Sequence, residues 1–128
     1  APFAVELFTR PSAGLPVSIE EGDRRLDFLY GPDAAAACIA AATATGPLRP
    51  AYNIGGFSTR VRDVADAVRR IIPAAQLNVR AGGENPWPEA LDIAAAQRDL
   101  GWAPLHDLNS AVAEYLSFLA RPGAVLAP

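Results

Sequence analysis

The chain has 128 residues, 51% of them hydrophobic and 20% charged, with a formal net charge of −3. This length suits a single domain over residues 1–128, and the hydrophobic share excludes a generally disordered chain. The acidic balance argues against nucleic acid as a partner, and no apolar run approaches the roughly 18 residues that a membrane span needs.

The kinds of residue that are missing narrow the chemistry further. All 11 basic residues are arginine, and neither lysine nor methionine occurs. Without lysine the chain has no Schiff-base residue, no phosphate-binding P-loop lysine and no Tyr-x-x-x-Lys pair. Because methionine is missing even at position 1, we expect the chain to be part of a longer protein. The single cysteine and the lack of a leader segment predict a cytoplasmic protein.

Two helices and three short strands are expected in the first half of the chain. The helices are the end of one at Phe3–Thr9 and an alanine-rich one at Ala34–Thr45, capped by Asp33. Cys38 lies inside the second helix, where we expect it to be buried and inert. The strands are expected at Pro16–Glu20, Leu26–Tyr30 and Ala51–Ile54, and the last one leads into a tight turn at Gly55-Gly56.

The second half is expected to hold three helices and one strand, which completes a mixed α+β fold of short strands and four to five helices. Ser58 or Thr59 caps the first of these helices, whose apolar residues recur at helical spacing as far as Ile72. A strand at Gln76–Arg80 leads into a loop rich in glycine and proline. The remaining elements are a short helix that Asp92 caps, that runs through Leu100 and that Gly101 terminates, then an amphipathic helix over Leu108–Leu119 and a frayed tail from Pro122.

The sequence contains no catalytic or metal-binding set. The segment Gly55-Gly56-Phe57-Ser58 is not a dinucleotide fingerprint, because Phe57 replaces the second glycine, and a tight turn with a helix cap is favoured over an anion site. His106 is the only histidine, and we expect it to be a surface or locally hydrogen-bonded residue. The acidic residues are scattered, which argues against a catalytic carboxylate pair.

Arginines beside strands are the remaining candidates for ligand binding. Arg24 and Arg25 adjoin one expected strand, and Arg80 ends another just before the loop over Ala81–Glu89. A guanidinium at the mouth of a loop suits bidentate contact with phosphate. An ion pair at the surface is the simpler interpretation.

Four blocks of sequence follow one another from residue 14 to residue 104. The amphipathic helix that ends at Leu119 completes the pattern. The blocks read GLPVSI (14–19), LDFLYGPDAA (26–35), AYNIGG (51–56) and DIAAAQRDLGWAP (92–104). In content and order they resemble the C-terminal part of the extended short-chain dehydrogenases, which are the NAD-dependent sugar-nucleotide epimerases and dehydratases.

The resemblance implies the substrate-binding lobe of such an enzyme, without catalytic, cofactor-binding or metal-binding residues of its own. NAD or NADP would be held by an N-terminal Rossmann domain that this chain lacks, together with the catalytic tyrosine and lysine. The ligand would be a nucleotide sugar or a similar small molecule. Its contacts would be Arg80 at the diphosphate with Arg25 as a helper, backbone groups of Val17 to Ile19 at the base, and Phe57.

Differences from the family pattern leave a second interpretation open. Leu26 stands where the family has an arginine that contacts the diphosphate, and Ala95 replaces the usual lysine. The alternative is a non-catalytic module, derived from that family, that binds a small molecule or a protein. In either case we expect an apolar patch on the face toward the missing domain, and self-association through it.

Overall fold

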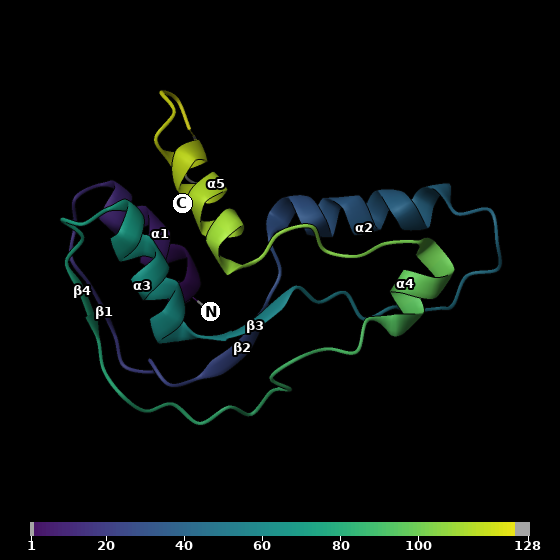
Figure 1. Cartoon of the computed structure of the whole chain (residues 1–128), viewed down its shortest axis with the longest axis horizontal. Coiled ribbons are helices and arrows are strands. Elements are labelled where there is room, and N and C mark those ends of the chain that lie inside the picture. Colours follow the sequence, from purple (N-terminus) through teal and green to yellow (C-terminus); the bar gives the residue numbers. More distant parts are fainter. Residues whose placement is uncertain (1, 125–128) are drawn as a thin grey trace.

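The computed structural model describes residues 2–124. Within them the chain forms five helices and four short strands, so the expected mixed α+β class is confirmed (Figure 1). In chain order the elements are α1 (Pro2–Ser12), β1 (Val17–Ile19), β2 (Arg25–Phe28), α2 (Gly31–Thr43), β3 (Phe57–Arg60), α3 (Val61–Ile71), β4 (Leu77–Val79), α4 (Ala94–Leu100) and α5 (Leu108–Leu119). No helix in this range has the length and apolarity that a membrane span requires.

The strands form two separate pairs. Strand β1 lies parallel to β4, with Val17 opposite Leu77, and β2 lies antiparallel to β3, with Phe28 opposite Phe57. Helices α1, α3 and α5 contact one another, α1 also contacts β1, and α3 also contacts β3 and β4. Together these elements make one rounded lobe, on the left of Figure 1.

A first core fills this lobe. Its buried residues come from α1, β1, α3, β4 and α5 and are Leu7, Val17, Ile19, Val61, Val64, Ala65, Ala67, Val68, Leu77, Val112 and Leu116. Helix α3 contributes most of them, because its apolar residues recur every three or four positions and so share one face. Pro73 follows the helix and cannot continue it, as expected.

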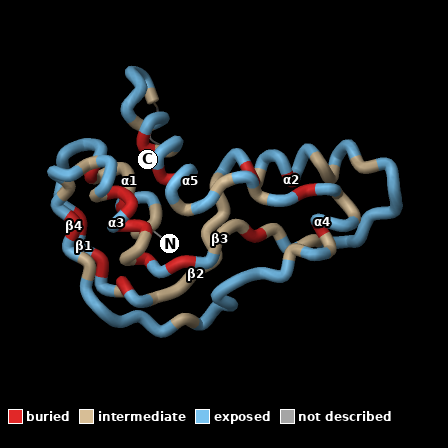
Figure 2. The backbone as a smooth tube through the Cα atoms, viewed as in Figure 1, coloured by how far each residue is buried: buried red, intermediate tan, exposed pale blue. Residues whose placement is uncertain are grey.

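A second, smaller core lies outside the lobe, where α2 and α4 extend to the right of Figure 1. It holds only Ala37, Ala96 and Trp102 as buried residues, with Tyr52 and Ile54 among the partly buried residues around them. The small alanine side chains allow α2 and α4 to approach closely, and the Trp102 indole fills the space beside them. Figure 2 shows the contrast, since buried residues cluster in the lobe and are sparse along α2 and α4.

The strand expected at Ala51–Ile54 is not formed, and the expected turn-and-cap segment after it is strand β3. The residues that join them explain the difference. A Cβ at Gly56 would overlap the Phe28 carbonyl oxygen, so this glycine lets the chain pass close enough to β2 to pair with it. Helix α3 consequently begins after Arg60, and Thr59 is a buried strand residue rather than a cap.

Two expectations for α2 are also wrong. Asp33 is not its cap, because the helix begins at Gly31 and the Asp33 side chain is directed to another segment. Cys38 is exposed rather than buried, since it lies on the face of α2 away from α4. The end of α4 is as expected, with Gly101 in the left-handed region at a φ of 63°. Of the tail expected to fray, residues 125–128 lie outside the described residues.

Candidate functional site

Val17 and Ile19, the strand residues expected to contact a ligand, lie in β1 with their side chains buried in the first core. The Val17 N–H donates to the Gln76 carbonyl at 3.0 Å, and the Ile19 carbonyl accepts from the Arg80 N–H at 2.8 Å. These backbone groups are therefore engaged with the β4 segment. Ser18 is the exposed residue of this strand.

Arg25 and Arg80 both have acidic neighbours. The Arg80 guanidinium lies 3.3 Å from the Glu20 carboxylate, and both side chains are 65% exposed. The Arg25 guanidinium donates to the Ser58 carbonyl at 3.2 Å and lies 3.8 Å from the Glu89 carboxylate. A phosphate group would have to compete with these carboxylates for either arginine.

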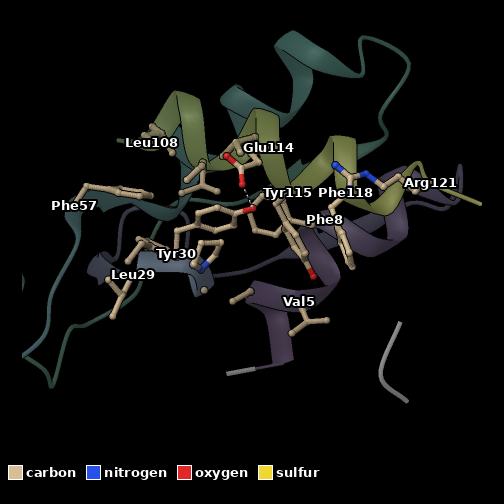
Figure 3. A pocket seen from close by; sticks show the side chains of 17 residues that line it. Val5, Phe8, Leu29, Tyr30, Phe57, Leu108, Glu114, Tyr115, Phe118 and Arg121 are labelled. Atoms are coloured by element: carbon tan, nitrogen blue, oxygen red, sulfur yellow. Dashed lines mark hydrogen bonds between the residues drawn. The ribbon is translucent and has the colours of Figure 1, made fainter. Parts of the chain in front are cut away.

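Phe57 lines an aromatic cavity of about 610 Å³ between α1, α5 and the β2–α2 junction (Figure 3). Its ring stacks on Phe28 with centroids 6.1 Å apart, and Phe8 meets Tyr115 edge-on at 5.1 Å. This volume lies within the range of about 300–1,000 Å³ that is usual for small-molecule sites. We call this space the aromatic cavity; its rings are those of Phe8, Phe28, Tyr30, Phe57, Tyr115 and Phe118.

The polar groups of the aromatic cavity are few and lie along α5. They include the Glu114 carboxylate, the Tyr30 hydroxyl that donates to it at 3.4 Å, the Tyr115 hydroxyl, and the Arg121 guanidinium, which lies 6.0 Å from the centroid of the Phe118 ring. Most of the described lining is aliphatic or aromatic, so the cavity can bind an apolar group.

The residues expected to form one substrate site are divided between two faces. Arg25 and Phe28 are three positions apart in β2, so their side chains point to opposite sides of the strand. Phe28 and Phe57 line the aromatic cavity, whereas Arg25 faces the loop that contains Glu89. The sequence could not reveal this division, because it follows from the pairing of β2 with β3.

Asp27 holds three segments together beside this loop. Its carboxylate accepts from the Gly56 N–H at 2.7 Å and from the Leu91 N–H at 2.9 Å. The neighbouring Asn85 side chain donates to the Arg25 carbonyl at 2.5 Å. The second and third sequence blocks, and the loop before the fourth, therefore meet at one carboxylate.

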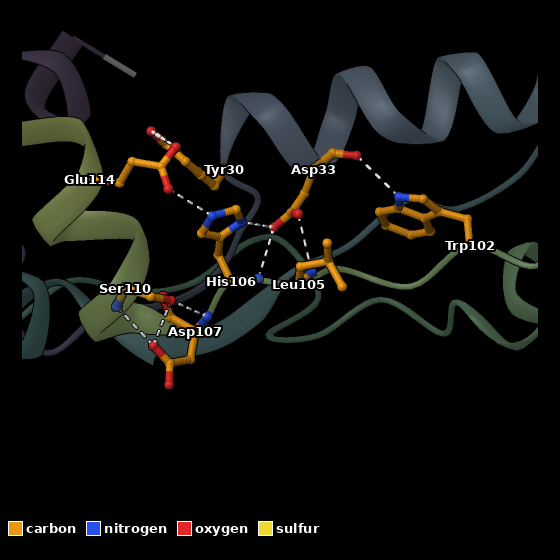
Figure 4. Close-up of polar contacts among 8 residues, drawn as sticks. All are labelled: Tyr30, Asp33, Trp102, Leu105, His106, Asp107, Ser110 and Glu114. Atoms are coloured by element: carbon orange, nitrogen blue, oxygen red, sulfur yellow. Dashed lines mark hydrogen bonds and ion pairs between the residues drawn. The ribbon is translucent and has the colours of Figure 1, made fainter. Parts of the chain in front are cut away.

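Asp33 makes the corresponding junction at the start of α2 (Figure 4). Its buried carboxylate accepts from the backbone N–H groups of Leu105 and His106, each at 3.1 Å, and contacts His106 Nδ1 at 3.0 Å. The Asp33 carbonyl accepts from the Trp102 indole N–H at 3.1 Å. The second and fourth sequence blocks are thus joined through one residue.

His106 lies between two carboxylates, which sequence reasoning did not anticipate. Its Nε2 is 3.0 Å from the Glu114 carboxylate, on the side opposite Asp33. The hydrogen bond from Asp33 raises the pKa of His106, burial opposes the rise, and Glu114 adds to it. Burial disfavours the Asp33 carboxylate, yet the hydrogen bonds from Leu105 and His106 outweigh it and lower the pKa of Asp33. The sequence offered one sign that Glu114 has a particular partner, since it is the only charged residue of α5.

Metal binding finds no support in residues 2–124, where no group of three or more histidine, cysteine, aspartate or glutamate side chains is arranged to hold an ion. The starts of helices α2 and α3 do not suit a pyrophosphate either. Helices α2 and α3 each carry an acidic residue in the first turn, Asp33 and Asp63. Those carboxylates would repel an anion at the place where a dinucleotide binds a helix.

No family model and no curated protein matches the sequence. Solved structures do. A partial-consensus L-threonine 3-dehydrogenase is 29% identical with a TM-score of 0.79, and the match covers 92% of this chain and 41% of that one. The apo form of L-threonine dehydrogenase from Cupriavidus necator is also 29% identical, with a TM-score of 0.76 over 91% of this chain and 45% of that one.

A third neighbour is UDP-glucuronic acid 4-epimerase from Bacillus cereus, solved with UDP-glucuronic acid and NAD. It is 22% identical with a TM-score of 0.75, over 89% of this chain and 38% of that one. These neighbours are extended short-chain dehydrogenases, so the resemblance carried by the four sequence blocks is confirmed. The chain spans less than half the length of each, which is consistent with a C-terminal fragment.

Proposed function

We propose that this chain is the substrate-binding part of an NAD-dependent dehydrogenase or epimerase of the extended short-chain dehydrogenase family. The observation that carries the proposal is the match in fold to two L-threonine dehydrogenases over more than nine-tenths of the chain. Three of the four sequence blocks support it, because Asp27 and Asp33 join the second, third and fourth in space.

NAD, in this proposal, is bound by a nucleotide-binding domain outside the chain. The acidic first turns of α2 and α3 and the lack of a G-x-G-x-x-G segment make this chain a poor host for the dinucleotide. The chain's own contribution is to bind the substrate and to close over it, so that remote binding energy orients the reacting group. We therefore expect the chain alone to show no NAD binding in the micromolar range by calorimetric titration.

Two substrate classes follow from the names of the neighbours, and the residues favour the smaller one. Leu26 places an alkyl side chain where a nucleotide-sugar enzyme of the family uses an arginine, and both Arg25 and Arg80 already have acidic neighbours. A small amino acid such as L-threonine needs no diphosphate contact. The two L-threonine dehydrogenases named above are 29% identical to the chain and the epimerase is 22% identical, while other L-threonine dehydrogenases are 19–24% identical.

A nucleotide sugar is the second candidate. One observation favours it, since Arg60 lies directly opposite Arg25 across the β2–β3 pair, which places two cationic residues side by side on the outer face. Arg80 would then be the main contact of the diphosphate, with Arg25 as a helper and Ser18, between Val17 and Ile19, offering backbone groups to the base. Phe57, also expected to contact the substrate, would do so from the face of the aromatic cavity.

A chimera tests the proposal and separates the two substrates. This chain would replace the matching part of the Cupriavidus necator L-threonine dehydrogenase, and the folded chimera would be assayed for NADH formation with L-threonine and for epimerisation of UDP-glucuronic acid. NADH formation is the expected result. A folded chimera that binds NAD but acts on neither compound would favour the alternative, a non-catalytic binding module.

The proposal also concerns partners. In it, the apolar rim beside the aromatic cavity, with Val5 55% and Phe118 43% exposed, faces the nucleotide-binding domain. When the chain is alone this rim should drive self-association. Sedimentation at increasing concentration should then show oligomers, and a strict monomer at millimolar concentration would contradict this part of the proposal.

A further inference from the structure

Helices α2 and α5 share an unusual composition, because each carries a single charged side chain. These are Asp33 in α2 and Glu114 in α5. Both contact His106, the only histidine of the chain, at 3.0 Å, one at each ring nitrogen. The two helices belong to different cores, so this histidine joins the two parts of the molecule (Figure 4).

The protonation of His106 follows from these contacts. The Asp33 carboxylate accepts two backbone N–H groups, which hold it in the ionised form, so Nδ1 must carry a hydrogen to approach it at 3.0 Å. Nε2 is equally close to the Glu114 carboxylate and needs a second hydrogen. A neutral imidazole has only one N–H, so the observed arrangement is that of the imidazolium.

The two carboxylates are held very differently. The Asp33 side chain is 4% exposed and fixed by the backbone, whereas the Glu114 side chain is 55% exposed. Tyr30 is the other group that faces the ring: it meets His106 edge-on at 4.8 Å, and its hydroxyl donates to Glu114 at 3.4 Å. Burial, Glu114 and Tyr115 raise the pKa of Tyr30, and Arg121 opposes the rise. Asp107, next to His106, accepts a hydrogen bond from the Ser110 N–H and does not face the ring.

We propose that His106 is a pH-sensitive clasp between α2 and α5 that fixes the polar edge of the aromatic cavity. When the imidazolium loses a proton, the Nδ1–H bond to Asp33 remains, and the Nε2 lone pair then faces the Glu114 carboxylate. Glu114 turns toward solvent, because nothing else in the clasp holds it except the Tyr30 hydroxyl. Tyr30 and Glu114 both line the aromatic cavity, so its wall loosens on that side.

This change occurs above the ordinary titration range of histidine. Histidine ordinarily titrates at 6.5, and the bonds from Asp33 and Glu114 raise the pKa of His106 above that value, with burial opposing them. The clasp is therefore closed in mildly acidic solution and opens as the pH rises through the raised value. This inference does not depend on the proposed substrate or on NAD.

Nuclear magnetic resonance of the whole chain tests the clasp directly, because one histidine gives one set of ring signals. The ring of His106 and the methyl groups of Leu29, Leu108 and Val112, which line the aromatic cavity, would be followed from pH 5 to pH 9. We expect the ring to titrate above 6.5 and the cavity methyl groups to shift with the same midpoint. A ring midpoint at or below 6.5, or methyl groups that do not follow it, would overturn the proposal.

Two variants sharpen the test. In Glu114→Gln the ring midpoint should fall toward 6.5, and the cavity methyl groups should lose their titration, because no carboxylate is left to be released. Glu6→Gln is the matched control, since Glu6 is exposed on α1, and both midpoints should stay as in the unaltered chain. An unchanged ring midpoint in Glu114→Gln would refute the role of Glu114, and the titration of the unaltered chain decides the proposal even if a variant fails to fold.

Discussion

The two cores of this molecule are built on different principles. The first core buries eleven residues contributed by five elements, and its stability comes from apolar contact. The second buries only two alanines and Trp102, and polar contacts connect its segments. The Asp33 carbonyl accepts from the Trp102 indole, and the Asp99 carboxylate accepts from Arg49 at 2.8 Å and from the Tyr52 hydroxyl at 3.4 Å. Hydrogen bonds to particular side chains therefore connect the second core, where apolar packing is thin, whereas apolar contact holds the first.

Replacing Trp102 by alanine should have the largest effect on the second core, at about 3–5 kcal/mol. Two alanines cannot form a core without the indole, so α2 and α4 should lose their protection in hydrogen exchange while α3 keeps it. A uniform loss of protection over both cores would show that they unfold as one unit and are not separately stabilised.

The corresponding change in the first core is Leu7→Ala, which should cost about 2–5 kcal/mol in urea unfolding. Leu7 is fully buried against α3 and α5, and the cavity left behind weakens the whole lobe. Val5→Ala is the matched control on the same helix, because Val5 is mostly exposed and should change stability by no more than about 0.5 kcal/mol. Equal effects of the two changes would contradict the burial of Leu7 and the exposure of Val5.

Asp27→Asn tests a polar junction without changing its size. The amide keeps one acceptor oxygen, so one of the two N–H groups, of Gly56 or Leu91, loses its partner at a cost of about 1–3 kcal/mol. Limited proteolysis should then cut the loop between β4 and α4 faster. Asp66→Asn removes only an exposed ion pair with Arg69 and serves as the control.

Because of the clasp between the cores, the free energy of unfolding should fall at both acidic and alkaline pH. The pKa of His106 is raised, so its contribution is fully present below pH 6.5 and is lost as the pH rises through the raised value. The pKa of Asp33 is lowered, so its contribution is present above pH 3.8 and is lost as the pH falls through the lowered value. Urea unfolding at several pH values should show a maximum between these limits, and His106→Gln should abolish the alkaline decline.

Arg80→Ala should have the smallest effect on stability, below about 1 kcal/mol, because its pair with Glu20 is exposed. The same variant decides between the two substrate classes in the chimera. Binding of a nucleotide sugar should weaken by about 1.5–3 kcal/mol if Arg80 contacts the diphosphate, and Arg80→Lys should restore only part of it. Unchanged kinetics with L-threonine would agree with the smaller substrate.

The sequence predicted the elements that depend on local pattern. Helix α3 follows from the spacing of its valines and from Pro73, and the end of α4 follows from Gly101, because these signals act within a few residues. Strand β3 was missed because its pairing with β2 depends on the absence of a side chain at Gly56. Local strand propensity contains no information about such a contact with a distant segment. Ala51–Ile54 has a strand pattern, yet no strand pairs with it in the structure.

The candidate site was less predictable than the fold. Val17, Ile19, Arg25, Arg80 and Phe57 were selected by resemblance, which says nothing of the faces on which they lie. His106 was judged without its partners, because Asp33 is 73 residues away and Glu114 is eight residues away. The charges of α2 and α5 were visible, but their meeting at one ring follows only from the packing of the two cores.

The pairing of β1 with β4 also determines when the lobe can fold. Val17 stays without its partner until Leu77 has been synthesised, and α1 does not complete its contacts until α5 is present. Contacts between residues so far apart in sequence carry a large loop-closure cost, and they slow folding. During synthesis α1 must therefore wait, with its apolar face exposed, until α5 has emerged, so α1 is a segment that a chaperone would bind.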